Sequence, residues 1–235
     1  MQMWNQEWDH EEYMEFINEP KHFINPVRDL RMFDSDYLEP LSKCPWYTIV
    51  VFWLIYILQY IPQLGKNYPL EAVLIVGGAN YFLFVEYILH RFLFHGEQYW
   101  MKHVPKNRYF YFAHFMLHGI HHAFPQDKNR LVLPPALGYF YFAVLFKQPF
   151  YLVMPESMLP AWMVGFVIGY LMYDLTHYFI HHSNPPEGSY FKFMKSYHMQ
   201  HHYKRGTEGF GISNKIWDKV FDTEIKTAVK DHLKN

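Results

Sequence analysis

Most of the 16 histidines lie in four short motifs, HRFLFH, HGIHH, HYFIHH and HMQHH. Two of these motifs contain the pattern HxxHH, and residues at positions i, i+3 and i+4 lie on one face of an α-helix. We therefore expect each motif to project its imidazole rings together. A buried ring nitrogen without a partner costs about 1–3 kcal/mol, whereas a bound metal ion uses that nitrogen as a ligand. The pattern predicts a metal site.

The number of histidines indicates two ions rather than one. A single ion takes four to six ligands in proteins, which is fewer than the motifs supply. His114, one helical turn before His118, either supports a ligand or, as we prefer, serves in packing or hydrogen bonding. The predicted ligands are His90, His95, His118, His121, His122, His177, His181, His198, His201 and His202.

Two acidic residues and one further histidine are candidates for supporting these ligands from outside. Glu86 lies one turn before His90, and Asp174 lies three residues before His177. Either carboxylate is therefore placed to accept a hydrogen bond from a ligand's outward N–H. For Glu86, contact with interfacial water or a neighbouring arginine is an alternative of equal weight. His182 either replaces the histidine before it or supports the site.

Composition excludes several other kinds of site. Cys44 is the only cysteine in 235 residues, which excludes a disulfide framework, a thiolate zinc cluster and a cysteine-ligated iron–sulfur centre. The 21 Lys and Arg nearly balance the 22 Asp and Glu, so nucleic acid is not an expected partner. No nucleophile elbow, P-loop or GxGxxG motif is present.

Long apolar stretches predict an all-α membrane protein. Residues 44–65 contain no Asp, Glu, Lys, Arg or His. At about 1.5 Å per residue, such a stretch crosses a hydrocarbon core of roughly 30 Å. The alternative, core helices of a large soluble protein, would leave too little polar sequence to cover them. The predicted transmembrane helices are residues 45–64, 70–89, 131–154 and 158–179.

Basic residues are concentrated between the second and third predicted spans, whereas the short connections after the first and third spans hold a single lysine. The positive-inside rule therefore places this connection, both termini and all four histidine motifs in the cytoplasm. We predict an N-terminal arm over residues 1–43 and a membrane domain over 44–235. Within this domain, a cytosolic helical cap over about 90–130 and 180–235 is expected to hold the ions.

Aromatic residues in the arm allow two interpretations. Trp4, Trp8, Tyr13 and Phe16 lie in an acidic stretch. They indicate either an amphipathic helix at the membrane interface or, as we prefer, ordinary packing of a cytosolic segment.

A two-metal histidine site facing a bilayer favours oxygen chemistry. Acyl chains and sterols offer unactivated C–H bonds on which an acid or a base cannot act, so redox activation of oxygen by the ions is expected. Histidine ligands alone permit zinc, iron, copper or nickel. A non-catalytic metal-binding or metal-transporting membrane protein is the alternative from another class. Transport requires polar residues through the bilayer interior, where these spans are apolar.

The order of the motifs resembles that of the membrane-bound fatty acid hydroxylase superfamily, which includes sterol desaturases. The resemblance spans about residues 38–223 and is carried by HRFLFH, HGIHHAFPQDKNRLVLPP, YDLTHYFIHH, YHMQHHYK and WDKVFDT. The second of these stretches, together with LEPLSKCPWY, is similar to fatty acid 2-hydroxylases that act on sphingolipid acyl chains. A sterol desaturase or a sphingoid-base 4-hydroxylase with the same metal centre is the alternative within the superfamily.

This resemblance implies a multi-pass enzyme of the endoplasmic reticulum with a cytosolic dinuclear centre, and all ten predicted ligands fall on family ligand positions. Iron is the expected metal, and zinc is possible in the purified protein. Oxygen and two electrons would give a 2-hydroxy acyl group on a ceramide or a free very-long-chain fatty acid. The candidates for lining an apolar substrate tunnel are Tyr173, Tyr178, Tyr203 and Phe210.

The expected electron donor follows from a departure from the family pattern. Many relatives carry an N-terminal cytochrome b5 domain, whereas this chain has no HPGG haem motif. We therefore expect no bound haem, and electrons from a separate cytochrome b5 and its reductase.

Overall fold

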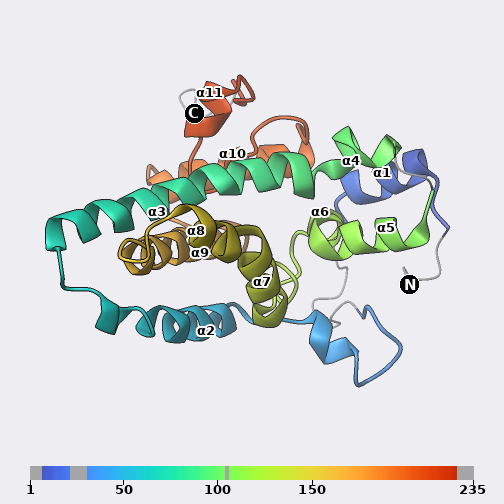
Figure 1. The fold of residues 1–235 in the computed structure, drawn as a ribbon. Helices are drawn as coiled ribbons and strands as arrows, with labels where there is room; N and C mark the ends of the chain where they lie inside the picture. The colour runs from blue at the N-terminus through green and yellow to red at the C-terminus, as the bar shows by residue number, and fades with distance from the viewer. Residues whose placement is uncertain (1–6, 22–30, 104–105, 227–235) are drawn as a thin grey trace.

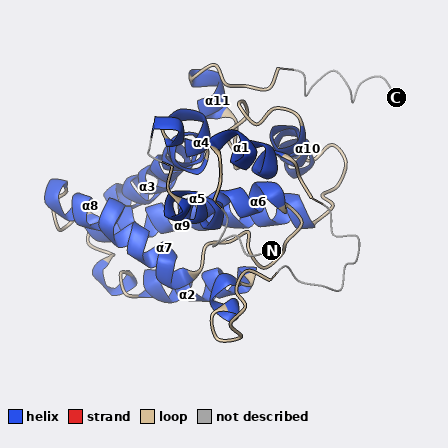
Figure 2. Cartoon of the chain, turned by 90° about the vertical axis from the view of Figure 1, so that its right-hand side faces the viewer, coloured by secondary structure: helices blue, strands red, loops and turns tan. Residues whose placement is uncertain are grey.

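The computed structural model describes residues 7–21, 31–103 and 106–226. Within these ranges the regular secondary structure is entirely helical (Figure 2), as predicted. The α-helices are α1 (His10–Asn18), α2 (Trp46–Leu58), α3 (Tyr68–Ile88), α4 (Gly96–Tyr99), α5 (Arg108–His114), α6 (Ile120–Ala123), α7 (Pro135–Phe142), α8 (Gln148–Val153), α9 (Leu159–His182), α10 (Tyr190–Tyr203) and α11 (Ile216–Val220). The 3-10 segments are η2 (Glu39–Ser42), η3 (Ile61–Gln63) and η5 (Met101–His103), and the π-helical segments are η4 (Leu89–Phe94), η6 (Phe115–Gly119) and η7 (Ala143–Lys147).

Three helical stretches of the described chain are long and apolar enough to cross a membrane, namely Trp46–Gln63, Tyr68–Phe94 and Leu159–His182. They coincide with the first, second and fourth predicted spans. The third predicted span corresponds to the consecutive segments α7, η7 and α8, which contain Lys147 and Gln148 and are not among the three. Four spans therefore remain a prediction. In Figure 1 the three long stretches occupy one half of the molecule, and α1, α4, α5 and α6 gather at the other end.

Helices α3 and α9 pack closely because glycines face the partner backbone. A Cβ atom at Gly165 would clash with the Ile75 carbonyl oxygen, and one at Gly78 would clash with the Trp162 carbonyl oxygen. Gly165 and Gly169 form a GxxxG pattern, which allows the backbones of membrane helices to approach each other. This packing fixes the end of α9, with its histidines, relative to η4, which continues α3.

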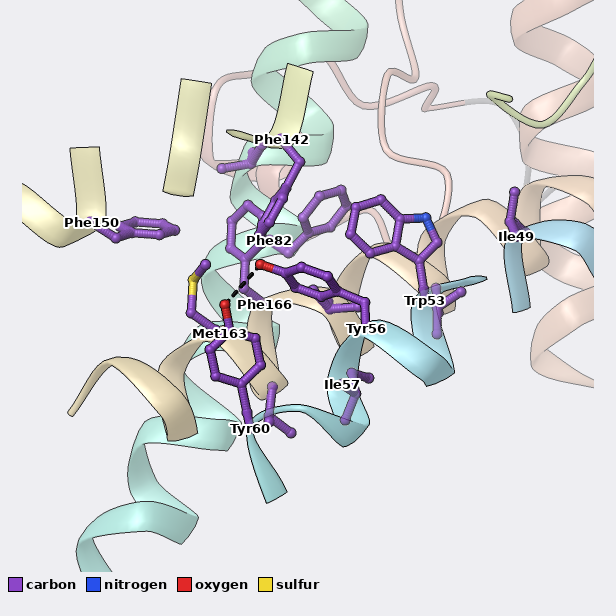
Figure 3. Close-up of a cluster of buried hydrophobic side chains, with 14 of the residues drawn as sticks. Ile49, Trp53, Tyr56, Ile57, Tyr60, Phe82, Phe142, Phe150, Met163 and Phe166 are labelled. Atoms are coloured by element: carbon purple, nitrogen blue, oxygen red, sulfur yellow. Dashed lines mark hydrogen bonds between the residues drawn. The ribbon is translucent and has the colours of Figure 1, made fainter. Parts of the chain in front are cut away.

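Aromatic side chains fill the space between α2, α3, α7 and α9 (Figure 3). The ring centroids of Trp53 and Phe142 lie 5.3 Å apart, and those of Phe82 and Phe166 lie 5.1 Å apart, both pairs in edge-to-face contact. Such pairs contribute about 0.5–1.5 kcal/mol each beyond the burial of their area. Much of the 21% aromatic content therefore serves to pack the membrane helices.

Helix α1 packs on the short helices that carry the HGIHH motif, as Figures 1 and 2 both show. Its first turn is closed by a capping box between Asp9 and Glu12. Tyr13 is fully buried, and Trp8 and Phe16 are partly buried in the same cluster. The structure therefore agrees with the preferred interpretation, ordinary packing, for these residues; Trp4 lies outside the described residues.

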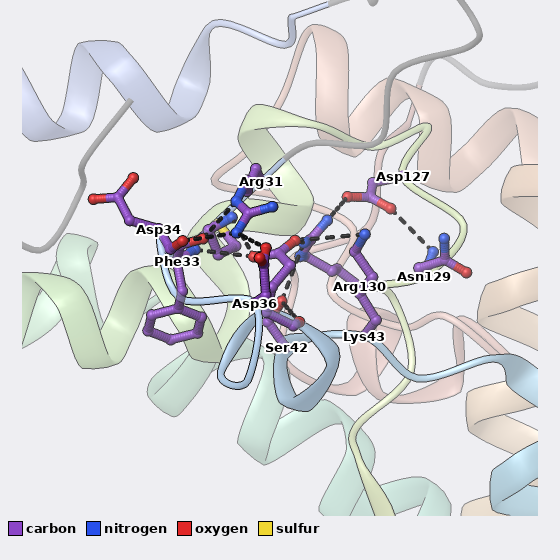
Figure 4. Close-up of polar contacts among 11 residues, drawn as sticks. Arg31, Phe33, Asp34, Asp36, Ser42, Lys43, Asp127, Asn129 and Arg130 are labelled. Atoms are coloured by element: carbon purple, nitrogen blue, oxygen red, sulfur yellow. Dashed lines mark hydrogen bonds and ion pairs between the residues drawn. The ribbon is translucent and has the colours of Figure 1, made fainter.

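A buried ion-pair network joins η2 to the segment after α6 (Figure 4). The Arg130 guanidinium donates to Glu39 at 2.6 Å, to Asp127 at 2.7 Å and to the Ser42 hydroxyl at 3.1 Å. Because Arg130, Glu39 and Asp127 are all buried, each charge depends on its partners. The network holds the DKNR part of the sequence against the segment that precedes α2.

Candidate metal centre

A π-helical turn brings His90 and His95 together. In an α-helix, residues five apart point in directions about 140° apart. The π-turn instead pairs residues i and i+5, and the backbone N–H of His95 donates to the His90 carbonyl at 3.0 Å. The ring centroids of the two histidines consequently lie 5.0 Å apart. The spacing in HRFLFH therefore suits a π-turn.

Nine of the ten predicted ligands form two groups of buried histidines. Within each group, the candidate ligand nitrogens all lie within 4.8 Å of one another. The five-histidine group consists of His121, His177, His181, His198 and His202, and the four-histidine group consists of His90, His95, His122 and His201.

His118, the tenth predicted ligand, lies beside the four-histidine group. Its ring centroid is 5.0 Å from that of His90, 5.2 Å from that of His95 and 4.7 Å from that of His122. Its Nε2 is buried and has no hydrogen-bond partner in the described chain. The position of His118 is compatible with a further ligand of this group.

Each HxxHH motif contributes to both groups, which differs from the expectation that its three rings point to one place. In HGIHH, His121 joins the five-histidine group and His122 the four-histidine group. In HMQHH, His198 and His202 join the five-histidine group and His201 the other. Consecutive helical residues point about 100° apart, so an adjacent pair of histidines reaches two sites. The motifs thereby connect the two groups.

The spacing of ring nitrogens fits metal coordination. The Nε2 atoms of His177 and His198 are 3.0 Å apart, as are those of His198 and His202, and those of His95 and His201 are 2.9 Å apart. Two nitrogens at about 2.1 Å from one ion, and at a right angle to each other, lie about 3.0 Å apart. These pairs therefore match adjacent positions around an ion.

Burial keeps five of these imidazoles, all outside the membrane helices, neutral. Loss of solvation, reinforced by neighbouring histidines, lowers the pKa of His121 and of His201 to about 3. The same causes lower the pKa of His118, His122 and His202 well below the ordinary value. A neutral imidazole retains a lone pair, which a metal ligand requires.

Three histidines of the four-histidine group donate their outward N–H to acceptors that the sequence did not reveal. The pairs are His90 Nδ1 with the Phe210 carbonyl at 2.5 Å, His95 Nδ1 with the Glu97 carboxylate at 2.8 Å, and His201 Nδ1 with the Glu208 carbonyl at 2.7 Å. Such partners fix the orientation of a ligating ring and leave Nε2 free for the metal.

Glu97 is ionised in this environment. Burial alone would raise the pKa of the Glu97 carboxyl, but the adjacent His95 and His114 lower it below the ordinary value. Glu97 lies two residues after His95, in the short helix α4. Its position so close to a motif histidine was the one local signal available from the sequence.

The predicted supporting residues have other partners. Glu86 accepts hydrogen bonds from the backbone N–H groups of Ile212 and Ser213, at 2.7 and 2.8 Å. Asp174 accepts one from the Tyr170 hydroxyl at 2.7 Å. The ring of His182 lies against Tyr178, with centroids 4.7 Å apart, and belongs to neither group. None of the three makes a hydrogen bond to a predicted ligand within the described residues.

A cavity of about 320 Å³ adjoins the histidines. His118, His121 and His177 line one part of it, and side chains of the aromatic core line another. Of the predicted tunnel residues, Tyr173 lines this cavity, whereas Tyr178, Tyr203 and Phe210 do not. The cavity therefore joins the apolar interior of the membrane helices to the five-histidine group and to His118.

Membrane-spanning helices and two buried all-histidine groups together define an integral membrane protein that can hold metal ions. Residues 75–223 match the family model described as fatty acid hydroxylase. The chain belongs to the fatty acid hydroxylase family.

Individual relatives are similar over most of the chain. The chain is 39% identical over 227 residues to a dihydroceramide fatty acyl 2-hydroxylase of Arabidopsis thaliana, covering 94% of this chain and 90% of that one. It is 37% identical over 219 residues to a ceramide very long chain fatty acid hydroxylase of Schizosaccharomyces pombe, covering 90% of this chain and 59% of that protein.

A solved structure described as full-length scs7p, with only the hydroxylase domain visible, superimposes with a TM-score of 0.86. The two sequences are 33% identical, and the match covers 95% of this chain and 81% of that chain. The helical fold is therefore that of a known hydroxylase domain.

Proposed function

We propose that this protein is a fatty acyl 2-hydroxylase that acts on the very-long-chain acyl group of a ceramide or of a related lipid. The observation that carries the proposal is the cavity that connects the aromatic core of the membrane helices to His121 and His177. An acyl chain in this cavity would extend from the apolar interior to the histidines. Membership of the fatty acid hydroxylase family and the activities named for the relatives support this substrate class.

The five-histidine group would hold one ion, and the four-histidine group, with His118, the other. The buried Nε2 atoms of His90, His121 and His122 have no hydrogen-bond partner in the described chain, which supports their role as ligands. We propose iron as the working metal, because iron supports oxygen chemistry; zinc would suit the same nitrogens. When bound, the ions would supply the activation of molecular oxygen.

The chain's own residues bind and orient the lipid and exclude water. Trp53, Phe82 and Phe166 give the acyl chain an apolar environment, in which each buried CH₂ group contributes about 0.8 kcal/mol. Arg130 also lines the cavity, and its buried Nε has no acceptor within the described chain. This N–H is available to the carbonyl oxygen next to carbon 2 of the acyl group, and Tyr173 would close the wall beside the reacting carbon.

The proposed setting is the endoplasmic reticulum membrane, with the histidines and both termini on the cytosolic side. The connection between α3 and α7 contains the basic residues from which this orientation was predicted. We further propose a fourth span formed by α7, η7 and α8, an arm over residues 1–43 and a cytosolic cap over about 90–130 and 180–235. A separate cytochrome b5 with its reductase would supply electrons to this cap.

The direct test is product formation by the purified protein. Metal-loaded protein with a ceramide, oxygen and reduced cytochrome b5 should form the 2-hydroxy acyl product, which mass spectrometry detects. His121→Ala should abolish the product because it removes a ligand, while Tyr111→Phe, which removes a hydroxyl that makes no hydrogen bond in the described chain, should retain it. Turnover by a His121→Ala protein that has lost its metal would refute the proposed centre.

Product identity distinguishes this proposal from the related enzymes. A sterol desaturase or a sphingoid-base 4-hydroxylase would use the same histidines. Cells that lack the protein should lose 2-hydroxy sphingolipids. Normal 2-hydroxy sphingolipids together with an accumulated sterol precursor or dihydro base would overturn the substrate assignment.

A further inference from the structure

We propose that helix α1 controls the occupancy of one of the two metal sites, through a buried chain of polar contacts that runs from Tyr13 to His95. This inference rests on the proposed two-ion centre but not on the substrate. It assigns a positioning role to Tyr13, a residue of the arm that precedes the membrane helices.

The chain consists of four side chains from separate elements. The Tyr13 hydroxyl of α1 lies 2.6 Å from Nδ1 of His114, at the end of α5. Nε2 of His114 lies 2.9 Å from Oε2 of Glu97. Oε1 of Glu97 lies 2.8 Å from Nδ1 of His95, a member of the four-histidine group. All four residues are at most 3% exposed, so water does not compete for these contacts.

The position of each proton follows from the neighbouring groups. His95 binds a metal through Nε2, so its proton is on Nδ1 and is donated to the Glu97 carboxylate. Nε2 of His114 faces both Glu97 and the carbonyl of Phe94 at 2.7 Å, and two acceptors require a donor between them. In neutral His114 the remaining nitrogen, Nδ1, is then an acceptor. In this tautomer Tyr13 donates its hydroxyl proton to His114.

The Tyr13 hydroxyl packs against the HGIHH motif. A Cβ atom at Gly119, between two predicted ligands, would lie 2.7 Å from the Tyr13 hydroxyl oxygen. The backbone N–H of Lys21, just after α1, donates to the Ala123 carbonyl at 2.8 Å. The glycine thus leaves room for the hydroxyl, and the contact at Ala123 holds α1 in place. α1 and the motif form one packed unit.

The effect should be confined to one ion. Nδ1 of His181, of His198 and of His202 in the five-histidine group is buried without a hydrogen-bond partner in the described chain. No comparable chain of side chains reaches that group within the described residues. Loss of the Tyr13 hydroxyl should therefore weaken metal binding by the four-histidine group alone.

The test is selective metal release from the full chain. Metal-loaded wild type, Tyr13→Phe, Glu97→Gln and Tyr111→Phe proteins are dialysed against increasing chelator concentrations, and bound metal is counted by mass spectrometry. Glu97→Gln should lose one ion at about 10–100-fold lower chelator concentration, as expected for a direct partner of a ligand. Tyr13→Phe should lose the same ion with a smaller shift. The second ion should be retained as in wild type.

Tyr111→Phe is the matched control. The Tyr111 ring lies 4.9 Å from that of Tyr13, and its hydroxyl makes no hydrogen bond in the described chain. Its release curve should equal that of wild type. Cobalt-substituted protein adds a signature that general destabilisation would not produce, namely a change in the absorption of one of the two cobalt ions.

The possible outcomes separate this inference from the proposed function. Release of both ions together from Tyr13→Phe, or a release curve equal to that of wild type, overturns the role of α1 and leaves the hydroxylase proposal intact. Wild type that binds fewer than two ions overturns both. If Tyr13→Phe does not fold, the metal release from Glu97→Gln tests the proposal instead. Unselective release from that variant also refutes a chain that acts through His95.

Discussion

The two histidine groups are built in different ways. Helices α9 and α10 supply four of the five histidines in the five-histidine group, and α6 supplies the fifth. The members of the four-histidine group come from η4, the turn that follows it, α6 and α10. Three of these four have an outward hydrogen-bond acceptor, whereas such acceptors are not found for His181, His198 and His202 within the described chain.

This difference indicates what determines each site. Long helices carry four of the five histidines in the five-histidine group, so that helix packing sets the positions of these four rings. In the four-histidine group, His95 and His122 lie on short segments, and three of the four rings depend on loop carbonyls or on Glu97 for orientation. Changes in the cap should therefore affect the two ions unequally.

The largest expected effect comes from removing a ligand of one group at a time. His198→Ala removes the ring whose Nε2 is 3.0 Å from those of both His177 and His202. We expect it to abolish activity and to lower the bound metal from two ions to one. His122→Ala is the matched change in the four-histidine group and should lower the count in the same way. Metal analysis of the purified variants measures both.

A second measurement shows which ion each variant loses. His198→Ala should keep the ion that Glu97→Gln releases, whereas His122→Ala should keep the other. If either alanine variant bound no metal, the two groups would form a single cooperative site, and the distinction between them would be wrong.

The next effect concerns overall stability rather than a chosen ion. Arg130→Met leaves the carboxylates of Glu39 and Asp127 buried without their shared cation. Removal of one partner from a buried ion pair costs about 3–5 kcal/mol. Chemical denaturation in detergent should show a loss of this size, and any metal loss should involve both groups equally.

Arg31→Met provides the control for this change. Arg31 pairs with Asp36 on the surface, where both side chains are largely exposed (Figure 4). An exposed pair contributes at most about 1 kcal/mol. Equal losses of stability from both variants would show that burial does not decide the strength of these ion pairs. Selective metal loss from Arg130→Met would weaken the comparison between the two histidine groups.

Sequence patterns predicted that the histidines come together, but not which histidine belongs to which of the two groups. The ten predicted ligands come together because helical spacing places motif histidines on inward faces. The division depends on the 100° step between adjacent residues, such as His121 and His122, and on the π-turn between His90 and His95, which α-helical spacing does not predict.

Partners distant in sequence account for most of what could not be predicted. The sequence predicts that Glu86 either supports His90, one turn away, or contacts interfacial water or a neighbouring arginine. Its carboxylate instead binds backbone and hydroxyl groups of Ile212 and Ser213, more than 120 residues away. Such contacts depend on how a loop closes over a helix, and no local periodicity describes that closure.

The third predicted span contains Lys147 and Gln148 and is not among the three stretches that are long and apolar enough to cross a membrane. The sequence pattern therefore predicts this span less strongly than the other three.

The smallest expected effect tests this loop. The Ser213 hydroxyl donates to Oε2 of Glu86 at 2.6 Å, and the same loop presents the Phe210 carbonyl to His90. Ser213→Ala removes a hydrogen bond with a net contribution of about 0.5–1.5 kcal/mol. If all of this energy acted through His90, the ion of the four-histidine group would bind roughly 2- to 13-fold more weakly. We expect a smaller effect, because only part of the energy acts through His90.

Ser183→Ala is the control for Ser213→Ala, since within the described residues the Ser183 hydroxyl bonds only to the carbonyl of Phe179, in the helix that Ser183 caps. The chelator titration should place Ser213→Ala between wild type and Glu97→Gln, and Ser183→Ala on the wild-type curve. A shift of the five-histidine ion in Ser213→Ala would mean that loop closure supports both sites. In that case, the helices would not be sufficient to set the ring positions of the five-histidine group.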